Sequence, residues 1–483
     1  MIFRQKLRIC DILPNMVEAM DKSILDSLLK RIDALERENA LLKSENERLK
    51  IELAAARKNS RNSSKPPSSD IVKPPPSGGK GKRRIGGQPG HEPHFRIVFT
   101  PEQLDEAHVF NPSSMLCSRC GGELRATPVA DQVRQQIDLC PDPLIRREYR
   151  APAYRCASCG TFHREKLPER IAKADFVGDS LAAALAFLNG KGHASYSALA
   201  AFMRDVCGER LSRGQIAKTF RRVSAAIETP YNEALARLPD EPVLNIDETG
   251  HREKGKRFWT WVFRARDFTV FHIDKTRAAD VLDRVLGPAY QGIIGCDYFS
   301  AYHKYIKDND GTAQFCLAHL VRELRFLAEH ANPETKGYAI RSLASIRRLF
   351  RIHHRLLENP DGDRSKLVKA GERLRRTIVR APPERKAENI AKRFLDNGDA
   401  YLRFIANPKI EPTNNRAEQA IRQVVIDRAA SQGTRGANGR EYKERMWTVL
   451  ATCAMRAASA YNFIRNALNA ASNNNDAPSL FTL

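Results

Sequence analysis

Two acidic residues stand in short apolar runs that are typical of β-strands. Asp247 lies in the run 242–250, and Asp297 lies in the run 292–298. Carboxylates at neighbouring strand ends form a good site for a hard cation, because Mg²⁺ and Mn²⁺ prefer oxygen ligands. Two such ions ~4 Å apart can cut and join phosphodiesters by in-line displacement, provided that a third acid completes the clamp. The sequence therefore points first to metal-dependent chemistry at phosphorus.

Glu418 is the candidate for the third acid. It lies in the segment 411–422, which opens a helix capped near Thr413 or Asn414. The buried stripe of this helix consists of Ala417, Ile421, Val424 and Val425. Glu418 stands just beside that stripe, one turn from Arg422, where it can face the two aspartates. The predicted catalytic set is therefore the two aspartates and this glutamate.

Two alternatives concern the identity of the metal ligands. Glu248 could replace Asp247, but adjacent side chains of a strand point to opposite faces, which favours Asp247. Cys316 and His319 have a spacing that could provide half of a metal site. A buried thiol, together with a histidine hydrogen-bonded at the start of a helix, is the interpretation that we favour for this pair.

Two arginines accompany the predicted acids. Arg322 and Arg422 can hold a phosphate group or simply pair with carboxylates, and the sequence leaves both interpretations open. Asp427, further along the same helix, is predicted to be a surface acid.

The elements that must position these residues follow one another in a recognisable order. Apolar runs predict an antiparallel meander of three strands, then a helix, a further strand, another strand and a helix. Their ranges are 242–250, 258–263, 269–273, 278–286, 292–298, 312–316 and 318–329. This order favours a ribonuclease-H-like core with a mixed sheet. Its first and fourth strands lie side by side, so Asp247 and Asp297 would emerge as neighbours.

A second metal site is indicated upstream. Two Cys-x-x-Cys pairs, each followed by glycine, supply Cys117, Cys120, Cys156 and Cys159. Four thiolates form the tetrahedral shell that structural Zn²⁺ prefers, and such a closed shell has no open position for a substrate. The 35 residues between the pairs can hold ribbon strands at 134–139 and 145–154. The alternative is four free thiols, and zinc is the favoured interpretation.

The segment before this module has a heptad pattern. Leucine fills one heptad position four times in succession, at Leu28, Leu35, Leu42 and Leu49. The other core position is occupied by Leu25, Ile32, Asn39, Asn46 and Leu53. Paired asparagines favour a parallel two-stranded coiled coil, so we predict a dimerisation helix. The alternative is a single surface helix with an apolar stripe.

A linker rich in Pro, Ser and Gly covers about 59–96. This composition cannot form a packed core and predicts an extended tether. It carries Lys80, Lys82, Arg83 and Arg84, which could lie along a phosphate backbone. A DNA-binding arm and a merely solubilising tether both fit this pattern.

The segment 179–227 is helical in pattern. One helix is predicted at 195–206, a turn at 207–209, and a second helix at 213–227 with Ser212 as its N-cap. This layout resembles a helix-turn-helix, in which the second helix would contact DNA. The polar residues of that second helix are Arg213, Gln215, Lys218, Arg221 and Arg222. An ordinary helical hairpin with solvated charges is the alternative.

Composition agrees with a polyanionic partner. The chain has 483 residues and a formal net charge of +23, spread along its length, which favours the phosphates of DNA or RNA. No run approaches the ~20 apolar residues of a membrane span. No secretory signal is visible, Met16 or Met20 could be the true start, and the scattered cysteines predict reduced thiols. We therefore expect a cytoplasmic protein.

These motifs together resemble the insertion-sequence-66 family of DDE transposases. The resemblance covers nearly the whole chain, and it rests on several short motifs in a fixed order. They are the zipper, 62–70, 87–91, the Cys-x-x-Cys pairs, 247–249, Asp297-Tyr298 with Tyr302, Cys316-x-Ala318-His319 with Arg322, and 414–418. The chain departs from the family pattern at 427–436, where an Arg-Lys pair and a Phe-x-Gly-Ser turn are absent from the sequence. How that loop contacts a transposon end is accordingly open.

The resemblance implies a function and a domain order. Asp247, Asp297 and Glu418 would hold Mg²⁺ or Mn²⁺, and the enzyme would cleave transposon ends and transfer them to target DNA. It would act as a homodimer or larger assembly associated with the bacterial nucleoid, with accessory proteins of the same element as possible partners. A non-catalytic DNA-binding regulator and a structure-specific nuclease of the same fold are the rival functions.

The predicted architecture is multi-domain α+β. Its parts are a coiled coil (21–57), a basic linker (58–105), a zinc-binding module (106–170), a helical region (171–240), the first part of the catalytic core (241–331), a helical insertion (332–401), the glutamate helix of the core (402–450) and a helical tail (451–483).

Overall fold

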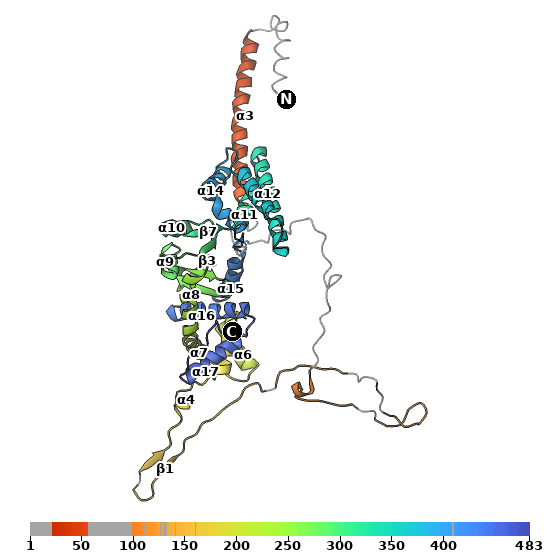
Figure 1. Cartoon of the computed structure of the whole chain (residues 1–483), viewed down its shortest axis with the longest axis vertical. Coiled ribbons are helices and arrows are strands. Elements are labelled where there is room, and N and C mark those ends of the chain that lie inside the picture. Colours follow the sequence, from red (N-terminus) through yellow and green to blue (C-terminus); the bar gives the residue numbers. More distant parts are fainter. Residues whose placement is uncertain are drawn as a thin grey trace. The chain divides into compact units, whose positions relative to one another are not determined.

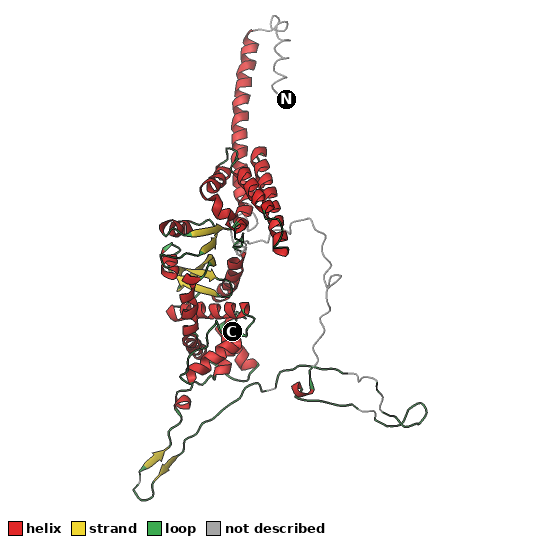
Figure 2. Ribbon diagram, in the orientation of Figure 1, coloured by secondary structure: helices red, strands yellow, loops and turns green. Residues whose placement is uncertain are grey.

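The computed structural model describes residues 22–56, 99–110, 113–125, 128, 133–140, 142–159, 161–407 and 410–483. The chain divides into two units (Figures 1 and 2). The larger unit contains Lys166–Ala201 and Leu211–Leu483 together with the N-terminal segment Met1–Pro74, and the smaller contains Pro75–Glu165 and Phe202–Arg210. The helices and the five-stranded sheet of the larger unit confirm the mixed α+β class.

The N-terminal described segment is one helix, α3 (Lys22–Ala56). Four leucines at the heptad spacing are about half exposed, namely Leu28 (47%), Leu35 (52%), Leu42 (53%) and Leu49 (51%). An apolar row left in water along a helix is unfavourable unless another surface covers it. The continuous helix agrees with the predicted segment, while its pairing with a second chain stays a prediction.

The larger unit is built on one five-stranded mixed sheet, with the order β5-β4-β3-β6-β7. Its strands are β3 (Val243–Glu253), β4 (Lys256–Arg264), β5 (Thr269–Asp274), β6 (Ile293–Cys296) and β7 (Thr312–Phe315). β3, β4 and β5 are antiparallel, whereas β3, β6 and β7 run parallel. The predicted adjacency of the first and fourth strands is confirmed.

One face of the sheet packs against two late helices, α15 (Asn415–Ser431) and α16 (Ala437–Met455). The shared core consists of Phe258, Val262, Phe271 and Ile273 from the sheet, Ala417, Ile421 and Val424 from α15, and Trp447 from α16. The alternation of β4 sends every second side chain to this face. The stripe predicted for the glutamate helix therefore does face the sheet, with Val425 partly buried at its margin.

The opposite face of the sheet is covered by α10 (Ser300–Asp308), which follows β6, with α9 (Asp280–Leu286) beside it. Trp261 of β4 lies edge-on to Tyr302 of α10, with ring centroids 6.1 Å apart. The hydroxyl of Tyr305 donates a hydrogen bond of 2.6 Å to the carbonyl of Gly287, just after α9. The sheet is thus sandwiched between helices, and its two faces have different partners.

α16 also covers the free edge of the sheet. Three of its side chains, spaced four residues apart, accept hydrogen bonds from alternate backbone N–H groups of β5. The pairs are Glu444 with Ile273 (2.6 Å), Thr448 with Phe271 (3.1 Å) and Thr452 with Thr269 (3.2 Å). Four helical residues rise ~6 Å and two strand residues ~6.8 Å, so the two spacings match. An edge strand that would otherwise offer free donors is blocked.

Four helices lie between the sheet and α15 in sequence. They are α11 (Leu317–Ala328), α12 (Pro333–Glu358), α13 (Ser365–Ile378) and α14 (Arg385–Leu402), and a short 3₁₀ turn, η4 (Arg403–Ile405), ends the series. The Asn332 side chain caps α12 and the Glu384 side chain caps α14. The segment predicted as a helical insertion is accordingly helical.

The remaining helices of the larger unit are α4 (Glu169–Ala172), α5 (Asp179–Gly190), α7 (Arg213–Ala226), α8 (Glu228–Arg237) and α17 (Ala460–Ser472). Helix α6 (Tyr196–Asp205) spans the division between the units. Ser212 caps α7 by accepting a hydrogen bond of 3.1 Å from the Gln215 N–H, as predicted. Helix α7 packs against α5, α16 and α17.

The smaller unit contains one short antiparallel pair, β1 (Ala153–Arg155) and β2 (Phe162–Arg164). The strand predicted at 134–139 is wrong, and of the strand predicted at 145–154 only Ala153 and Tyr154 form part of a strand. Ile137 (71%) and Ile145 (76%) are largely exposed. An apolar run becomes a strand only where a partner supplies hydrogen bonds, and the paired segment lies around the second cysteine pair instead.

Candidate active site

Parallel pairing of β3 with β6 brings two predicted acids together. Asn245 stands opposite Gly295, and two further residues along each strand lead to Asp247 and Asp297. Backbone N–H groups hold both carboxylates. Asp247 accepts from the Glu248 N–H at 3.0 Å, and Asp297 accepts from the Phe299 N–H at 3.1 Å. Two half-buried carboxylates therefore occupy adjacent positions, Asp247 within β3 and Asp297 directly after the end of β6.

Strand alternation separates Asp247 from Glu248. Asp247 pairs in register with Val262, whose side chain belongs to the core shared with α15. Glu248 pairs with Trp261 and so faces the opposite helices. There its carboxylate accepts a hydrogen bond of 2.7 Å from Arg277 Nε and another from the Tyr302 hydroxyl. These contacts favour Asp247 over Glu248 as the ligand.

Arg277 is itself held in place by aromatic rings. Its guanidinium carbon lies 3.7 Å from the centre of the Phe299 ring and 4.8 Å from that of Trp259. Cation–π contacts of this kind fix the guanidinium beside its carboxylate. Glu248 is only 9% exposed, so its charge depends on this partner.

Glu418 lies in the first turn of α15 and on the face that packs against the sheet. Its position depends on Asn414, which is 1% exposed and joins α15 to the catalytic strand. The Asn414 amide donates to the Ile246 carbonyl at 2.7 Å and accepts from the Asn245 amide at 3.0 Å. The Asn414 N–H also donates to Cys316 Sγ at 3.1 Å. Sequence analysis identified Asn414 only as a possible helix cap.

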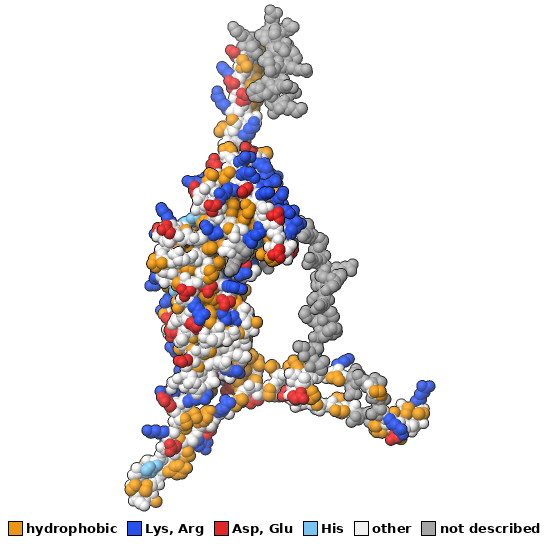
Figure 3. Space-filling view, in the orientation of Figure 1, with side chains coloured by type: hydrophobic (Ala, Val, Ile, Leu, Met, Phe, Trp, Pro, Cys, Tyr) orange, Lys and Arg blue, Asp and Glu red, His pale blue; other side chains and the backbone are white. Residues whose placement is uncertain are grey.

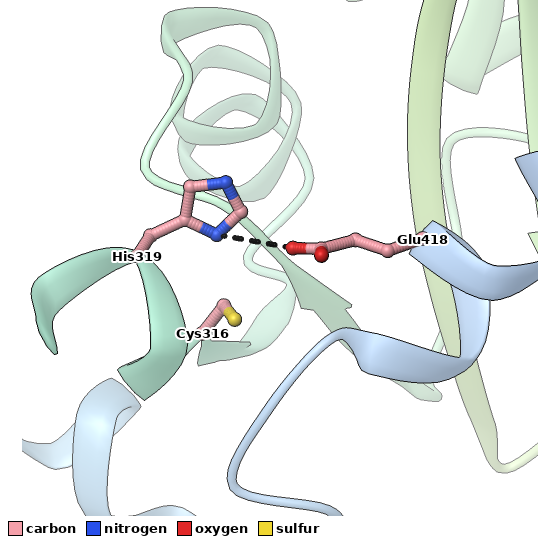
Figure 4. Close-up of side chains that lie close together, drawn as sticks. All are labelled: Cys316, His319 and Glu418. Atoms are coloured by element: carbon pink, nitrogen blue, oxygen red, sulfur yellow. Dashed lines mark ion pairs between the residues drawn. The ribbon is translucent and has the colours of Figure 1, made fainter. Parts of the chain in front are cut away.

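Figure 4 shows Cys316 and His319 beside Glu418. Ligand-type atoms of the three residues lie within 4.8 Å of one another. Arg322 donates to both Glu418 oxygens, at 2.9 and 3.1 Å, and to His319 Nε2 at 3.1 Å. Because a guanidinium only donates, Nε2 must be the accepting nitrogen, and the proton of a neutral ring sits on Nδ1, 3.7 Å from Glu418 Oε1. His319 is thus held by a hydrogen bond from Arg322, which favours the hydrogen-bonded interpretation of this residue.

The charges of the site raise the pKa of both aspartates. Burial, followed by the nearby charges of Glu248, Asp297 and Glu418, raises the pKa of Asp247 well above its usual value. Burial and Glu248 raise the pKa of Asp297 to about 7, although Arg277 opposes them. Clustered carboxylates with raised pKa values are typical of sites that bind a cation or handle protons.

Arg322 links this cluster to a cavity of about 740 Å³. The cavity lies against the start of α15 and is bordered by Arg325 and Arg416 as well as by Phe350 and His354 of α12. Of these, Arg416 is paired with Glu411 at 2.6 Å. A basic hollow therefore adjoins the acidic cluster, with Arg322 between the two.

The other predicted DNA-binding residues are scattered. Lys80, Lys82, Arg83 and Arg84 lie outside the described residues, and so does most of the linker. On α7, Arg213 and Arg221 are exposed and Gln215 is half-buried, whereas Lys218 pairs with Asp175 and Arg222 pairs with Asp175 and Asp179. Arg422 is exposed on α15. Acid partners thus make Lys218 and Arg222 less available to phosphate than Arg213 and Arg221.

Asp427 was wrongly predicted to be a surface acid. It is 2% exposed, and its carboxylate lies 2.8 Å from Lys443 Nζ and 2.9 Å from the Trp447 indole nitrogen. Lys443 and Trp447 belong to α16, so this ion pair joins α15 to α16. A polar residue within a helix pattern does not reveal a buried partner on the next helix.

The cysteine pairs form two separate turns. Around the first, the Cys117 N–H donates to the Gly122 carbonyl at 2.7 Å, and Gly121 takes a positive φ of 75°. Around the second, the Cys156 N–H donates to the Thr161 carbonyl at 2.8 Å. Within the described residues, the four sulfur atoms of Cys117, Cys120, Cys156 and Cys159 do not form one cluster. Within each turn the two thiols lie close enough to hydrogen-bond to each other.

The sheet and its acids define a class of protein. Two aspartates at adjacent positions on neighbouring parallel strands, with a glutamate on a helix that packs on the same face, form the arrangement expected of a DDE transposase.

Comparison with known proteins identifies the family. The model of the transposase IS66 family matches residues 175–442, which is more than half of the chain, so the protein belongs to this family. A zinc-finger binding domain of transposase IS66 matches residues 115–160, and a family of unknown function matches residues 13–96. The uncharacterized protein y4hP of Sinorhizobium fredii (strain NBRC 101917 / NGR234) is 22% identical over 391 residues, covering 73% of this chain and 70% of its own length.

Family membership establishes the general activity. The protein is a DDE transposase, an enzyme that cleaves and transfers DNA and therefore binds it. Across the described part of the chain, no helix is both long and apolar enough to span a bilayer.

The raised pKa of Asp297 predicts a pH dependence of stability. The folded state retains the Asp297 proton up to about pH 7, whereas the unfolded chain loses it near pH 4. The unfolded state binds fewer protons in this window, so the free energy of unfolding falls as pH rises, by at most ~1.4 kcal/mol per pH unit. Asp297→Asn should therefore gain stability over the wild type between pH 5 and pH 7, with the difference levelling off above pH 7.

Denaturant unfolding of the metal-free protein can test this, because all three tryptophans, Trp259, Trp261 and Trp447, report on the sheet and α16. Asp308→Asn is the control, since Asp308 is exposed and pairs only with Lys304 within its own helix. A difference between Asp297→Asn and wild type that stays constant across this range would contradict the argument.

Proposed function

We propose that Asp247, Asp297 and Glu418 are the metal ligands of this transposase. The observation that carries the proposal is the adjacent position of two high-pKa aspartates, one in β3 and one directly after β6, on the face where α15 brings Glu418. Such an oxygen donor set fits Mg²⁺ or Mn²⁺. When bound, a pair of ions would supply an activated hydroxyl nucleophile and stabilise the leaving oxygen.

The remaining residues of the site have supporting roles in this proposal. Asn414 sets the distance between α15 and β3, and Arg277 keeps Glu248 neutralised on the other face. Arg322 holds Glu418 through both carboxylate oxygens, so release of that contact frees a guanidinium beside the basic cavity. A guanidinium there suits the phosphate of a DNA strand.

The fold proposed for this unit is a ribonuclease-H-like core interrupted by a helical insertion. It is supported by the strand order and by the three helices that separate β7 and α11 from α15. The insertion explains why the third acid is distant in sequence from the second.

Substitution of Asp297 tests the catalytic proposal. Asp297→Asn should bind DNA but lose both strand cleavage and strand joining, by at least about a thousandfold, because metal stabilisation of charge at phosphorus contributes several kcal/mol. The substrate is a duplex carrying the DNA ends that flank the gene, assayed with Mg²⁺ or Mn²⁺.

Asp308→Asn is the matched control, because it also removes one carboxylate from the same unit. A fully active Asp297→Asn protein would rule out the assignment. Cleavage without joined products in the wild type would favour a nuclease, and binding without any cleavage would favour a regulator or a missing accessory protein.

We also propose that the two cysteine turns bind one structural Zn²⁺. The donor set fits, since hydrogen bonds from the Arg119 and Cys120 N–H groups lower the pKa of Cys117, and the Thr161 hydroxyl leads the contacts that lower the pKa of Cys159 to about 7. A lower thiol pKa favours the thiolate that a zinc ligand must be. The family match over residues 115–160 supports the same proposal.

Metal analysis tests the zinc proposal. The purified protein should contain about one zinc ion per chain, because four thiolates complete one tetrahedral shell. Cys120→Ser should lose this zinc, whereas Cys140→Ser, which alters a thiol outside both pairs, should keep it. Full zinc content in Cys120→Ser would show that the zinc is bound elsewhere in the protein.

A dimeric coiled coil is proposed for α3. Its support is the half-exposed leucine row, which a second copy in register would cover.

We also propose two further contacts with DNA. They are made by the basic arm at Lys80, Lys82, Arg83 and Arg84 and by the α7 residues Arg213 and Arg221. Location beside the nucleoid and the need for accessory proteins also stay predictions.

Light scattering tests the coiled coil. Leu35→Lys combined with Leu42→Lys should convert the dimer into monomers, since buried like charges oppose association. Ala34→Lys combined with Ser44→Lys is the matched control, because it adds the same two charges at exposed positions on the outer face of the helix and should leave the dimer intact. Unchanged mass after the leucine substitutions would mean that α3 is not the dimerisation element.

A further inference from the structure

The helices α12, α13 and α14 carry a large share of the positive charge. Residues 332–405 contain 18 Lys and Arg and nine Asp and Glu, so 18 − 9 leaves +9 of the net +23. Figure 3 shows Lys and Arg side chains gathered over the region where α12 lies. None of these residues belongs to the acid cluster or to α7.

Four arginines of α12 form one exposed stripe. They are Arg341, Arg348, Arg351 and Arg355. Successive separations of seven, three and four residues place them within about 80° of arc on the helix surface. The stripe spans 14 residues, or about 21 Å. A small exposed residue, Ala344, lies on the same face, so a partner can approach this part of the helix closely.

The charge of this stripe is not neutralised by neighbouring acids. No acidic residue lies between Glu334 and Glu358, so Arg341, Arg348 and Arg351 have no acid within four residues along the helix. In the part of the chain that the structure describes, none of the four guanidinium groups has an ion-pair partner. Other arginines of this region do pair, as Arg393 does with Glu323 at 2.8 Å. The row of unpaired guanidinium groups therefore distinguishes this face of α12 from nearby arginines that are paired with acids.

Helix α13 repeats the pattern next to α12. Its exposed face carries Lys366, Lys369, Arg373 and Arg376, at separations of three, four and three residues. Its buried face consists of Leu367, Ala370, Leu374 and Ile378. The two helices pack against each other, so the basic surface extends beyond a single helix.

We propose that the arginine stripe of α12 binds the sugar-phosphate backbone of duplex DNA, independently of sequence. The proposal rests on the function as a DNA transposase and assigns a second DNA-binding surface to it. A length of about 21 Å covers about six base pairs at 3.4 Å each, and guanidinium groups match phosphate geometry. α12 contains no Asn or Gln to read adenine, and contact with the evenly spaced phosphates requires only the guanidinium groups of the stripe.

Salt dependence of DNA affinity tests the proposal. The stripe variant carries Arg341→Gln, Arg348→Gln, Arg351→Gln and Arg355→Gln. The control variant carries Lys173→Gln, Arg237→Gln, Arg284→Gln and Lys304→Gln, which removes the same charge from exposed residues that already pair with acids. Both are measured as full chains on a duplex of random sequence, with circular dichroism to confirm folding.

The stripe variant should release fewer counterions on binding. Each lost phosphate contact lowers the slope of log affinity against log salt by about 0.9, so four contacts lower it by up to about 3.6. Between 50 and 200 mM salt, the wild type and the control should then lose about a hundredfold more affinity than the stripe variant. This specific change in slope is the expected result.

Two results would overturn the proposal. Equal slopes for the two variants would mean that only the overall charge matters. A wild-type slope in the stripe variant would mean that this face does not bind DNA and instead binds an acidic protein or contacts only solvent. Neither result bears on catalysis, which Asp297→Asn tests separately. Loss of cleavage in Asp297→Asn with an unchanged salt slope in the stripe variant would keep the proposed function while rejecting the stripe.

Discussion

The parallel pairing of β3 with β6 is the constraint on which the rest of the site depends. It places Asp247 and Asp297 at adjacent positions, where burial and the charges of neighbouring acids raise the pKa of both. Two carboxylates so close together are unfavourable in a protein interior unless opposite charge is supplied. The surrounding helices therefore have to do two things. They must hold the strands in this register, and they must bring compensating groups to the correct face.

Compensation differs on the two faces of the sheet. Glu248 is matched by Arg277, and Glu418 is matched by Arg322, so each of these acids has its own guanidinium. The hydrogen bonds to Asp247 and Asp297 described above come from backbone N–H groups instead. A positive charge placed between Asp247 and Asp297 would therefore stabilise the site most. A divalent cation there would bind both aspartates and Glu418.

Local patterns were sufficient to predict the elements and most of the acids' surroundings. Apolar runs located all five strands of the sheet, and alternation along β3 favoured Asp247 over Glu248 before any contact was known. The Ser212 cap and the buried stripe of α15 were likewise encoded within a few residues of sequence. Each of these features depends on neighbours within one or two turns or on the period of a single strand.

Contacts between distant segments could not be predicted in this way. Asn414 bonds to Asn245 across 169 positions, and Asp427 is buried by groups on the next helix. The strands expected before the second cysteine pair were largely wrong for the same reason, because periodicity does not identify the segment with which a strand pairs. Such long-range polar contacts decide where the glutamate helix sits. The helical insertion that precedes it has to leave α15 able to reach β3, and Asn414, directly before α15, fixes the return of the chain to the catalytic strand.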